Sequence, residues 1–370
     1  MKRLLLAGAG HAHLDVIRSM ATRRWPGVEV TLVCPYPRQI YSGMIPGWMA
    51  GHYTLDQCAA PLAALVAAAG IRWIEDSICA IDADAGTVDC RKAGKIAYDL
   101  ISLDTGAQVD SSALAGSGEK LLAIRPLEEF VLAWQRHRAA LLASGKARLA
   151  VVGGGAAGIE LALAADQALR LHLPAGELAV TIVSSGGLLA GHAPGVVRLV
   201  ERTLAARGIA LRSGRASGHA KGLLLAGGEL IAADCLIAAT GVAPPAWLAA
   251  SGLALCERGF IAVGDGQQSV SHREVFAAGD VSSRIDAPHA KSGVYAVRAG
   301  PVLTMNLQRA LAGEPPASYQ PQKRSLYLLA TGPREAIVSW GAFAAAGAWA
   351  WRWKDWIDRR FMRQYQARRS

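Results

Sequence analysis

Two glycine-rich segments each follow a short apolar run, an arrangement suited to phosphate binding. The first, Gly8-Ala9-Gly10, comes directly after the run Leu4–Ala7. The second follows the run ARLAVV and has Gly153, Gly155 and Gly158 at the full GxGxxG spacing. A glycine loop that opens a helix presents free backbone N–H groups and the positive end of the helix dipole, and both favour a pyrophosphate. Two such loops in one chain predict two nucleotide cofactors that face each other.

The first loop departs from the dinucleotide fingerprint at its last position, where His13 replaces the expected glycine or alanine. Two interpretations stay open. The imidazole turns toward the cofactor, or it is tolerated at a looser contact between helix and strand. A metal site formed with His11 is disfavoured, because no third ligand lies nearby in the sequence. The sequence therefore predicts no metal.

A late Gly279-Asp280 pair follows the apolar run EVFAA and gives a second contact point for a cofactor. Its carboxylate can accept hydrogen bonds from a sugar-like polyol; the alternative is an aspartate that caps a helix. The segment His289–Gly293 then opens a helix. If that N-terminus faced an isoalloxazine ring, it would stabilise negative charge on reduced flavin.

The elements that must position these loops form an approximate internal repeat. Each unit reads as a strand, a glycine loop, a helix, a second strand and, later, a strand that ends in Thr-Gly. In the first unit we expect a strand at Leu4–Ala7, a helix from His11 to about Ala21, a strand at Glu29–Val33 and a strand ending at Thr105-Gly106. In the second unit, the strand LAVTIVSS follows the helix, and a later strand ends in a second Thr-Gly. This alternation predicts an α/β fold.

Composition supports an enzyme-like α/β protein and argues against a nucleic-acid partner. The 370 residues are 52% hydrophobic and include 40 glycines, which predicts two or three domains. The formal charge is +10. The segment 351–370 has seven Arg or Lys and two acids, so it carries about half of this excess. A basic appendage on a nearly neutral body is predicted, with no groove for nucleic acid.

The cysteines and apolar segments point to the cytoplasm. The six cysteines include no CxxC pair and no spacing suited to zinc, so we expect reduced, packing cysteines. The N-terminal apolar run is short and reads as a strand rather than a signal peptide. The charge-free run Gly341–Trp351 is too short to cross a bilayer.

These motifs, taken together, resemble the two-dinucleotide-domain flavoproteins of the pyridine nucleotide-disulfide oxidoreductase superfamily. The resemblance covers residues 2–310. The segments GAGHAH, YSGMIPGWMAGHY and SGVYAVRAGPVLTMNL are similar to the branch near type II NADH dehydrogenases, some of whose members are associated with selenophosphate synthetase. The resemblance implies two Rossmann-like domains: a discontinuous FAD-binding domain at 1–110 and 234–318, and an inserted NAD(P)-binding domain at 111–233. A small C-terminal region at 319–370 follows.

The resemblance also implies roles for individual residues. It places Gly8, Gly10, His11, Met44, Ile45, Pro46, Thr105, Gly106, Asp280, Ala290 and Lys291 at the FAD. Our predicted FAD-binding set adds His13, Cys34 and Gly279. Gly153, Gly155 and Gly158 would hold the phosphates of NAD(P)H. Glu160 would lie close to the nicotinamide, and Glu160 and Lys291 are the candidate catalytic residues. The alternative for Glu160 is a partly buried helical acid paired with a neighbour.

Several departures from the family pattern affect the expected nucleotide binding. The acid that binds the FAD ribose is missing, because the second strand ends in Val33-Cys34-Pro35. At the matching place in the middle unit stand Ser184-Ser185. An acid there would bind the 2′-hydroxyl and repel a 2′-phosphate, so its absence predicts weak binding with little preference between NADH and NADPH. The dithiol of the disulfide reductases is also absent.

The C-terminal region contains five of the ten tryptophans and ends in a predicted amphipathic helix. Its helical face consists of Trp349, Trp353, Trp356, Ile357 and Phe361, with Arg352, Arg359 and Arg363 along one edge. Tryptophan beside arginine suits peripheral contact with the inner face of a membrane. The alternative, which we favour slightly, is a helix that packs on its own body or on a second subunit.

The combined pattern predicts an FAD-dependent enzyme that moves electrons from NAD(P)H through flavin N5 to a small-molecule acceptor, with a quinone as the candidate. A second hypothesis is a flavoprotein oxidoreductase of selenium or sulfur metabolism, associated with selenophosphate synthetase. A third is a flavin-bound partner protein with little turnover, which the two missing ribose acids favour.

Overall fold

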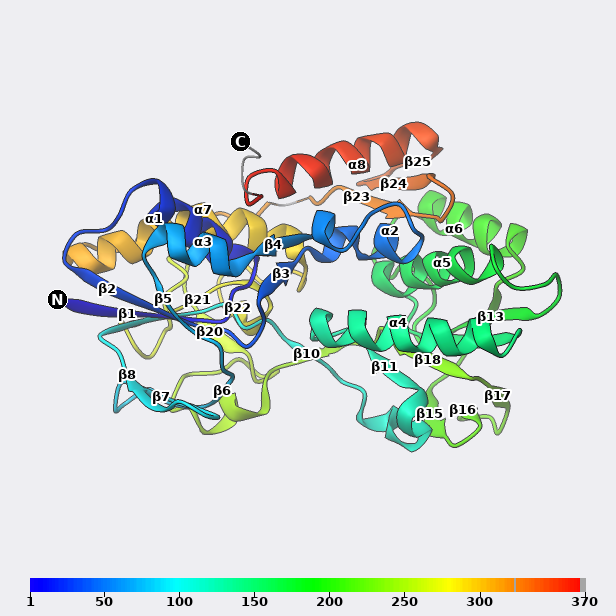
Figure 1. The fold of residues 1–370 in the computed structure, drawn as a ribbon, viewed down its shortest axis with the longest axis horizontal. Coiled ribbons are helices and arrows are strands. Elements are labelled where there is room, and N and C mark those ends of the chain that lie inside the picture. The colour runs from blue at the N-terminus through cyan, green and yellow to red at the C-terminus, as the bar shows by residue number, and fades with distance from the viewer. Residues whose placement is uncertain (323, 367–370) are drawn as a thin grey trace.

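The computed structural model describes residues 1–322 and 324–366, which form two α/β halves side by side (Figure 1). The first half is built on a parallel sheet. In spatial order its strands are β21 (Val275–Ala277), β9 (Leu100–Leu103), β1 (Lys2–Ala7), β2 (Val28–Val33) and β5 (Arg72–Ile74). The central strand β1 pairs with β2 along its whole length and with β9 on its other side.

Alternate side chains of β1 enter two different cores. Leu4 and Leu6 pack with the helices α1 (His11–Thr22), α3 (Leu62–Ala69) and α7 (Gly293–Ala312). Leu5 and Ala7 pack on the opposite face with the antiparallel sheet of β6 (Ile78–Asp82), β7 (Thr87–Cys90) and β8 (Gly94–Ala97). Because both faces of the parallel sheet are covered, the strand is apolar at every position from Leu4 to Ala7.

The second half repeats this architecture. Its parallel sheet consists, in spatial order, of β11 (Leu121–Ala123), β18 (Cys235–Ala238), β12 (Ala147–Val152), β13 (Leu178–Ser184) and β14 (Ala210–Ser213). Leu149 and Val151 pack with the helices α4 (Leu127–Ala143), α5 (Ala156–Arg170) and α6 (Pro194–Ala206). Ala150 and Val152 face the antiparallel sheet of β15 (Ala216–His219), β16 (Gly222–Leu225) and β17 (Leu230–Ala232). The predicted α/β class with two Rossmann-like units is confirmed.

Two connections run side by side where the halves meet. β10 (Gln108–Val109) pairs antiparallel with β19 (Val242–Ala243), between the two halves in Figure 1. The sequence places the return to the first domain at residue 234. However, β18 follows that position and pairs with β12, so it belongs to the second sheet. The chain leaves the second half only after this fully buried strand has completed the sheet.

The C-terminal region adds a small antiparallel sheet and a final helix. The sheet consists of β23 (Tyr327–Ala330), β24 (Ala336–Trp340) and β25 (Phe343–Gly347), and α8 (Ala348–Met362) follows directly. In Figure 1, α8 extends from this sheet back toward the first half. None of the helices in 1–322 and 324–366 is long and apolar enough to cross a membrane.

Helix α8 packs on the body of the protein, and Trp351 is the one of its four tryptophans that packs against the core. Lys354, Asp358, Phe361 and Met362 are buried. The exposed aromatic side chains of this region, which we call the aromatic face, are Trp340, Phe343, Trp349, Trp353 and Trp356, each 37% to 56% exposed. The predicted stripe is therefore wrong at Phe361, which packs inward against His11 and Tyr41.

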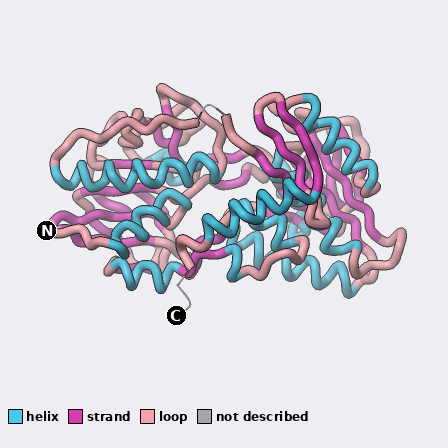
Figure 2. The backbone as a smooth tube through the Cα atoms, turned by 90° about the horizontal axis from the view of Figure 1, so that it is seen from above, coloured by secondary structure: helices cyan, strands magenta, loops and turns pink. Residues whose placement is uncertain are grey.

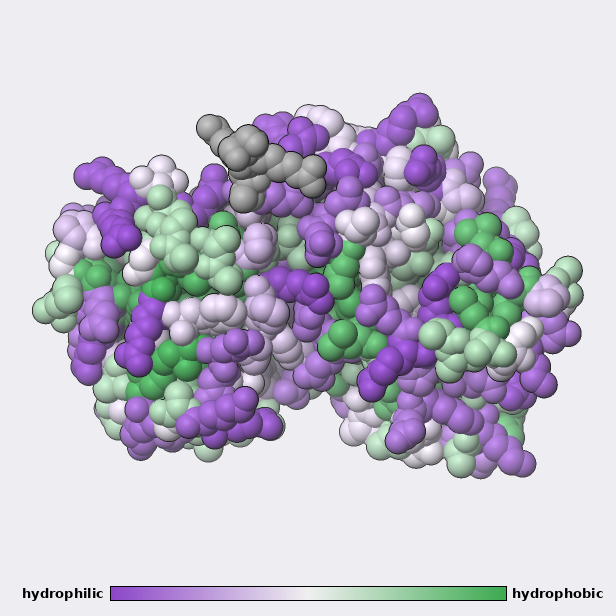
Figure 3. Space-filling model, in the orientation of Figure 1, coloured by the Kyte–Doolittle hydropathy of each residue, from purple (hydrophilic) through white to green (hydrophobic). Residues whose placement is uncertain are grey.

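The remaining elements are short, and loops join the helices and strands throughout both halves (Figure 2). The strands are β3 (Arg38–Ile40), β4 (Ala59–Pro61), β20 (Ile261–Val263) and β22 (Ser282–Arg284), and the helix is α2 (Ile45–Met49). The 3₁₀ turns are η1 (Ser42–Met44), η2 (Asp56–Cys58), η3 (Ser112–Lys120), η4 (Ala246–Ala250) and η5 (Gly279–Val281). Figure 3 shows mixed polar and apolar side chains over one face and a notch between the halves at its lower edge.

Candidate functional site

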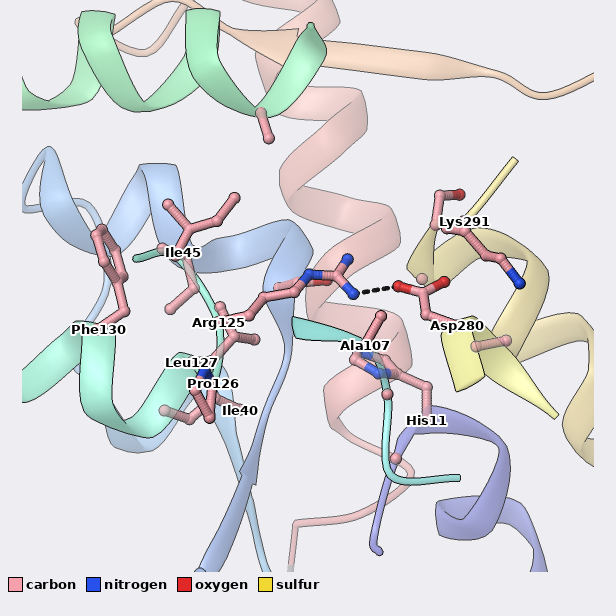
Figure 4. Close-up of a pocket in the computed structure, with 18 of the residues that line it drawn as sticks. His11, Ile40, Ile45, Ala107, Arg125, Pro126, Leu127, Phe130, Asp280 and Lys291 are labelled. Carbon is pink, nitrogen blue, oxygen red and sulfur yellow. Dashed lines mark hydrogen bonds and ion pairs between the residues drawn. The ribbon is translucent and has the colours of Figure 1, made fainter. Parts of the chain in front are cut away.

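A pocket of about 880 Å³ is lined by both glycine loops. Gly8 and Gly10 contribute from the first half, and Gly154 and Gly155 from the second. Because each loop follows the carboxyl end of a parallel strand and opens a helix, N-termini from both halves are directed at the same space. Figure 4 shows the residues that surround part of this pocket.

The first loop is built around the buried carboxylate of Asp104, at the end of β9. One carboxylate oxygen accepts hydrogen bonds from the backbone N–H groups of Ala12 (2.8 Å) and His13 (3.0 Å). A side chain at Gly10 would overlap this carboxylate, and a side chain at Gly8 would meet the backbone of Thr105. Gly8 also has a φ of 81°, which favours glycine. The sequence reasoning missed Asp104.

His13, which we expected at the cofactor, lies inside the protein instead. Its Nδ1 is 2.6 Å from the carbonyl oxygen of Gly8, and its Nε2 is 2.8 Å from the hydroxyl of Ser102. Burial lowers the pKa of His13 to about 4. The bulky side chain fits because it ties the loop to β9, and it is absent from the residues that line the pocket. This placement corrects its expected role as a cofactor ligand.

Two buried polar atoms of the pocket lining have no hydrogen-bond partner among the described residues. One is Nε2 of His11, and the other is the hydroxyl of Ser292, the N-cap residue of α7. Burial also lowers the pKa of His11 to about 4, so its ring is neutral at pH 7. Because buried polar groups normally find a partner, these two atoms indicate that a ligand belongs in the pocket.

An ion pair between Arg125 and Asp280 crosses the pocket (Figure 4). Asp280 lies in η5, and Arg125 precedes α4. The carboxylate faces the pocket rather than capping a helix, which favours the first of the two alternatives for Asp280. The sequence reasoning missed Arg125, because a single arginine before a proline carries no local signal.

Lys291 and Ala290 line the pocket, but the ammonium group of Lys291 is turned away from it (Figure 4). The ammonium donates a hydrogen bond to the carbonyl of Ser282 and lies 4.0 Å from the centre of the Phe260 ring. Burial lowers the pKa of Lys291 to about 8. These contacts tie the side chain to the protein, so its expected catalytic role has no geometric support.

In the second loop, each of the three fingerprint glycines has a different physical reason. A side chain at Gly153 would overlap the carbonyl of Ala239, and one at Gly158 would overlap the carbonyl of Gly153. Gly153 therefore allows close approach of the segment that follows β18, and Gly158 allows α5 to pack closely on the loop that precedes it. A side chain at Gly155 would meet no other atom, and Gly155 lines the pocket. It is therefore the fingerprint glycine available to a phosphate.

The other expected cofactor residues lie as follows. Pro46, Thr105 and Gly106 line the pocket, whereas Met44 and Gly279 do not, and Met44 is fully buried. Cys34 and Ser184 line it at the ends of β2 and β13, where the ribose acids are missing. The hydroxyl of Ser184 already donates to the carbonyl of Gly187, at 2.6 Å.

Glu160 lines the pocket from α5, and helix α8 supplies charges behind it. The carboxylate of Glu160 accepts a hydrogen bond from the backbone N–H of Ala330, at 2.8 Å. The ammonium of Lys354 donates to Asp358 at 2.9 Å and to the carbonyl of Gly43 at 2.7 Å. Burial raises the pKa of Glu160 to about 7, while the charge of Lys354 acts to lower it. The sequence reasoning missed Lys354 and Asp358.

The family model described as "Pyridine nucleotide-disulphide oxidoreductase" matches residues 2–300. The chain is 28% identical over 250 residues to an "NADH dehydrogenase-like protein" of Mycobacterium tuberculosis, a match that covers 64% of this chain and 61% of the relative. It is 30% identical over 202 residues to the biphenyl dioxygenase system ferredoxin–NAD(+) reductase component of Paraburkholderia xenovorans, covering 51% and 44%. The matches thus span about half to three fifths of these relatives.

Solved structures with the same fold cover almost the whole chain. NDH2 from Plasmodium falciparum, in complex with NADH, superimposes with a TM-score of 0.81 at 10% identity and covers 98% of both chains. The sulfide:quinone oxidoreductase from Aquifex aeolicus superimposes with a TM-score of 0.79 at 18% identity and covers 99% of this chain and 91% of its own.

The buried charges behind Glu160 predict opposite effects of two substitutions. Lys354→Met removes the cation that favours the ionised carboxylate, so the pKa of Glu160 should rise by roughly one pH unit or more. Asp358→Asn removes a neighbouring negative charge, so the same pKa should fall. Carbon-13 NMR titration of labelled glutamate, with Glu160→Gln to assign the signal, measures both shifts. An unchanged pKa in both variants would contradict this coupling, and Lys95→Met, at an exposed lysine, serves as the control.

Proposed function

The chain belongs to the pyridine nucleotide-disulphide oxidoreductase family, and we propose that it is an FAD-dependent enzyme that takes electrons from NAD(P)H and passes them to a small-molecule acceptor. One observation carries the proposal: two glycine loops, one from each half, open onto the same pocket. A flavin held by the first loop and a nicotinamide held by the second would therefore meet in one protected space.

The pocket lining fits FAD at several points. Gly8, Gly10 and His11 would contact the pyrophosphate, and Asp280 with Arg125 would bind the polyol chain. The unpartnered hydroxyl of Ser292, at the start of α7, would meet the flavin ring together with the helix N-terminus. FAD, when bound, supplies the hydride and electron transfer between NAD(P)H and the acceptor.

NAD(P)H would bind at the second loop, with its phosphates at Gly155 and its nicotinamide beside Glu160. The ribose would meet no acidic side chain, because Ser184 stands at that position. The hydroxyl of Ser184 already donates a hydrogen bond to the carbonyl of Gly187. Weak binding with little preference between NADH and NADPH follows. Glu160 would hold or release a proton near pH 7, since burial raises its pKa to about 7.

A quinone is our candidate acceptor, because α8 combines two properties. Its outward side contributes three tryptophans to the aromatic face, with Arg352 and Arg360 exposed beside them. Its inward side packs Phe361 against His11, a residue of the pocket lining. An aromatic and basic face suits the headgroup region of an anionic membrane. A lipid-soluble quinone dissolves in the apolar interior of the same membrane and could be reached from there.

Loss of Asp280 should weaken flavin binding. Asp280→Ala removes a partner of the cofactor and leaves Arg125 unpaired, at a cost of about 1–3 kcal/mol or about five- to 150-fold in Kd. The fluorescence of released flavin measures the change, and Asp84→Ala, at an exposed carboxylate, is the matched control. The proposal is wrong if the wild-type protein purifies colourless and takes up no added FAD.

Removal of exposed tryptophans should reduce binding to anionic vesicles. The double change Trp353→Ser and Trp356→Ser removes apolar area from the aromatic face with little effect on folding, and we expect at least about tenfold weaker binding, or about 1.4 kcal/mol. Vesicle pelleting at low salt measures it. Leu132→Ser, at an exposed position of α4, is the control. Equal pelleting of wild type and double variant would remove the membrane from the proposal.

A further inference from the structure

Asp104 is a buried acid that the proposed reaction does not use. It is 3% exposed and lies at the end of β9, between the two segments that we assign to FAD. A side chain at Gly10 in the first loop would overlap the Asp104 carboxylate, and one at Gly279 in η5 would come within 2.5 Å of Oδ1. The carboxylate therefore fills a space that both glycines leave open, and it holds the two segments against each other.

The negative charge of Asp104 is compensated by backbone N–H groups at the N-terminus of α1, and by no cation among the described residues. Oδ2 accepts two backbone N–H groups from the first turn of α1, those of Ala12 and His13. Asp104 forms no ion pair with a cation among the described residues. The side chains around it offer no positive charge either: His11 and His13 on α1 are buried with their pKa lowered to about 4, and Asp280 on η5 is a second carboxylate whose partner is Arg125.

We propose that Asp104 positions the two cofactor-binding segments and takes up a proton when FAD binds. This inference rests on the proposed function, which places the pyrophosphate at Gly8, Gly10 and His11. The pyrophosphate brings two negative charges to a site that already holds an unpaired carboxylate, and like charges at close range favour the protonated acid. Water supplies the proton, and it goes to Oδ1, the oxygen that the two N–H groups leave free.

The direction of the pH dependence follows from this arrangement. Burial raises the pKa of Asp104 to about 7, opposed by its two backbone hydrogen bonds. Bound pyrophosphate raises this pKa further, so the bound state carries more protons than the free state in the range above pH 7. Affinity for FAD therefore falls as the pH rises, by up to about tenfold per pH unit for one proton.

The test measures the Kd for FAD between pH 6.0 and 9.0, from the fluorescence of flavin released on dilution of the holoprotein. For wild type we expect about a tenfold increase in Kd between pH 6.5 and pH 8.5. Asp104→Asn keeps an oxygen for the two N–H groups but removes the titration, so its Kd should vary less than about twofold over this range and lie below the wild-type value at pH 8.5. Asp99→Asn, on an exposed carboxylate paired with Arg3, should keep the wild-type profile.

Two outcomes overturn the inference: a flat wild-type profile, or an Asp104→Asn profile as steep as that of wild type. The second outcome would assign the titration to Glu160 or Lys291, the other pocket residues with a pKa near 7 or 8. If Asp104→Asn does not fold, Glu160→Gln and Lys291→Met take its place: the slope should persist in both variants, and its loss in either one overturns the inference. A protein that binds no FAD at any pH contradicts the proposed function instead, so the two failures are distinguishable.

Discussion

The site depends on a steric constraint: backbone must approach backbone closely where each parallel strand turns into its helix. At Gly158 a single added carbon would overlap the carbonyl of Gly153, and at Gly8 it would overlap the carbonyl of Asp104. Only glycine allows α1 and α5 to begin so close to their strands. This closeness brings the N-termini of both helices to one pocket. The proposed phosphate binding, cofactor orientation and meeting of two nucleotides all depend on it.

Local sequence was sufficient to predict the parts of the fold that follow from local patterns. The strand–glycine–helix units are short and periodic, so β1, α1, β12 and α5 agree with expectation. The site residues that the sequence reasoning misplaced depend on contacts that sequence spacing does not reveal. His13 turns inward because Ser102, 89 residues away, offers a partner. No nearby motif identifies Asp104, Arg125 or Lys354 as site residues. Each of them contacts partners that lie on other elements, far away in the sequence.

The C-terminal helix links the outer surface to the pocket through its two sides. The inward side of α8 contains the buried ion pair of Lys354 and Asp358, whereas three of its tryptophans are exposed. Burying such a pair is costly unless it is well hydrogen-bonded, and here the carbonyl of Gly43 provides a further partner. The pair fixes the rotation of α8, and this rotation leaves the aromatic face exposed. The same pair acts on the pKa of Glu160. The ion pair therefore affects both the exposed aromatic face and the protonation of a pocket residue.

Above all, the proposed function requires that a nicotinamide and a flavin meet in the pocket between the two loops. Anaerobic titration of the flavin-loaded protein with NADH, and separately with NADPH, tests this claim most directly. We predict loss of the oxidised flavin absorbance after about one equivalent of either nucleotide, because hydride transfer is a two-electron step. A flavin that dithionite bleaches but neither nucleotide reduces would contradict the account, and would favour a flavin-bound protein with little turnover.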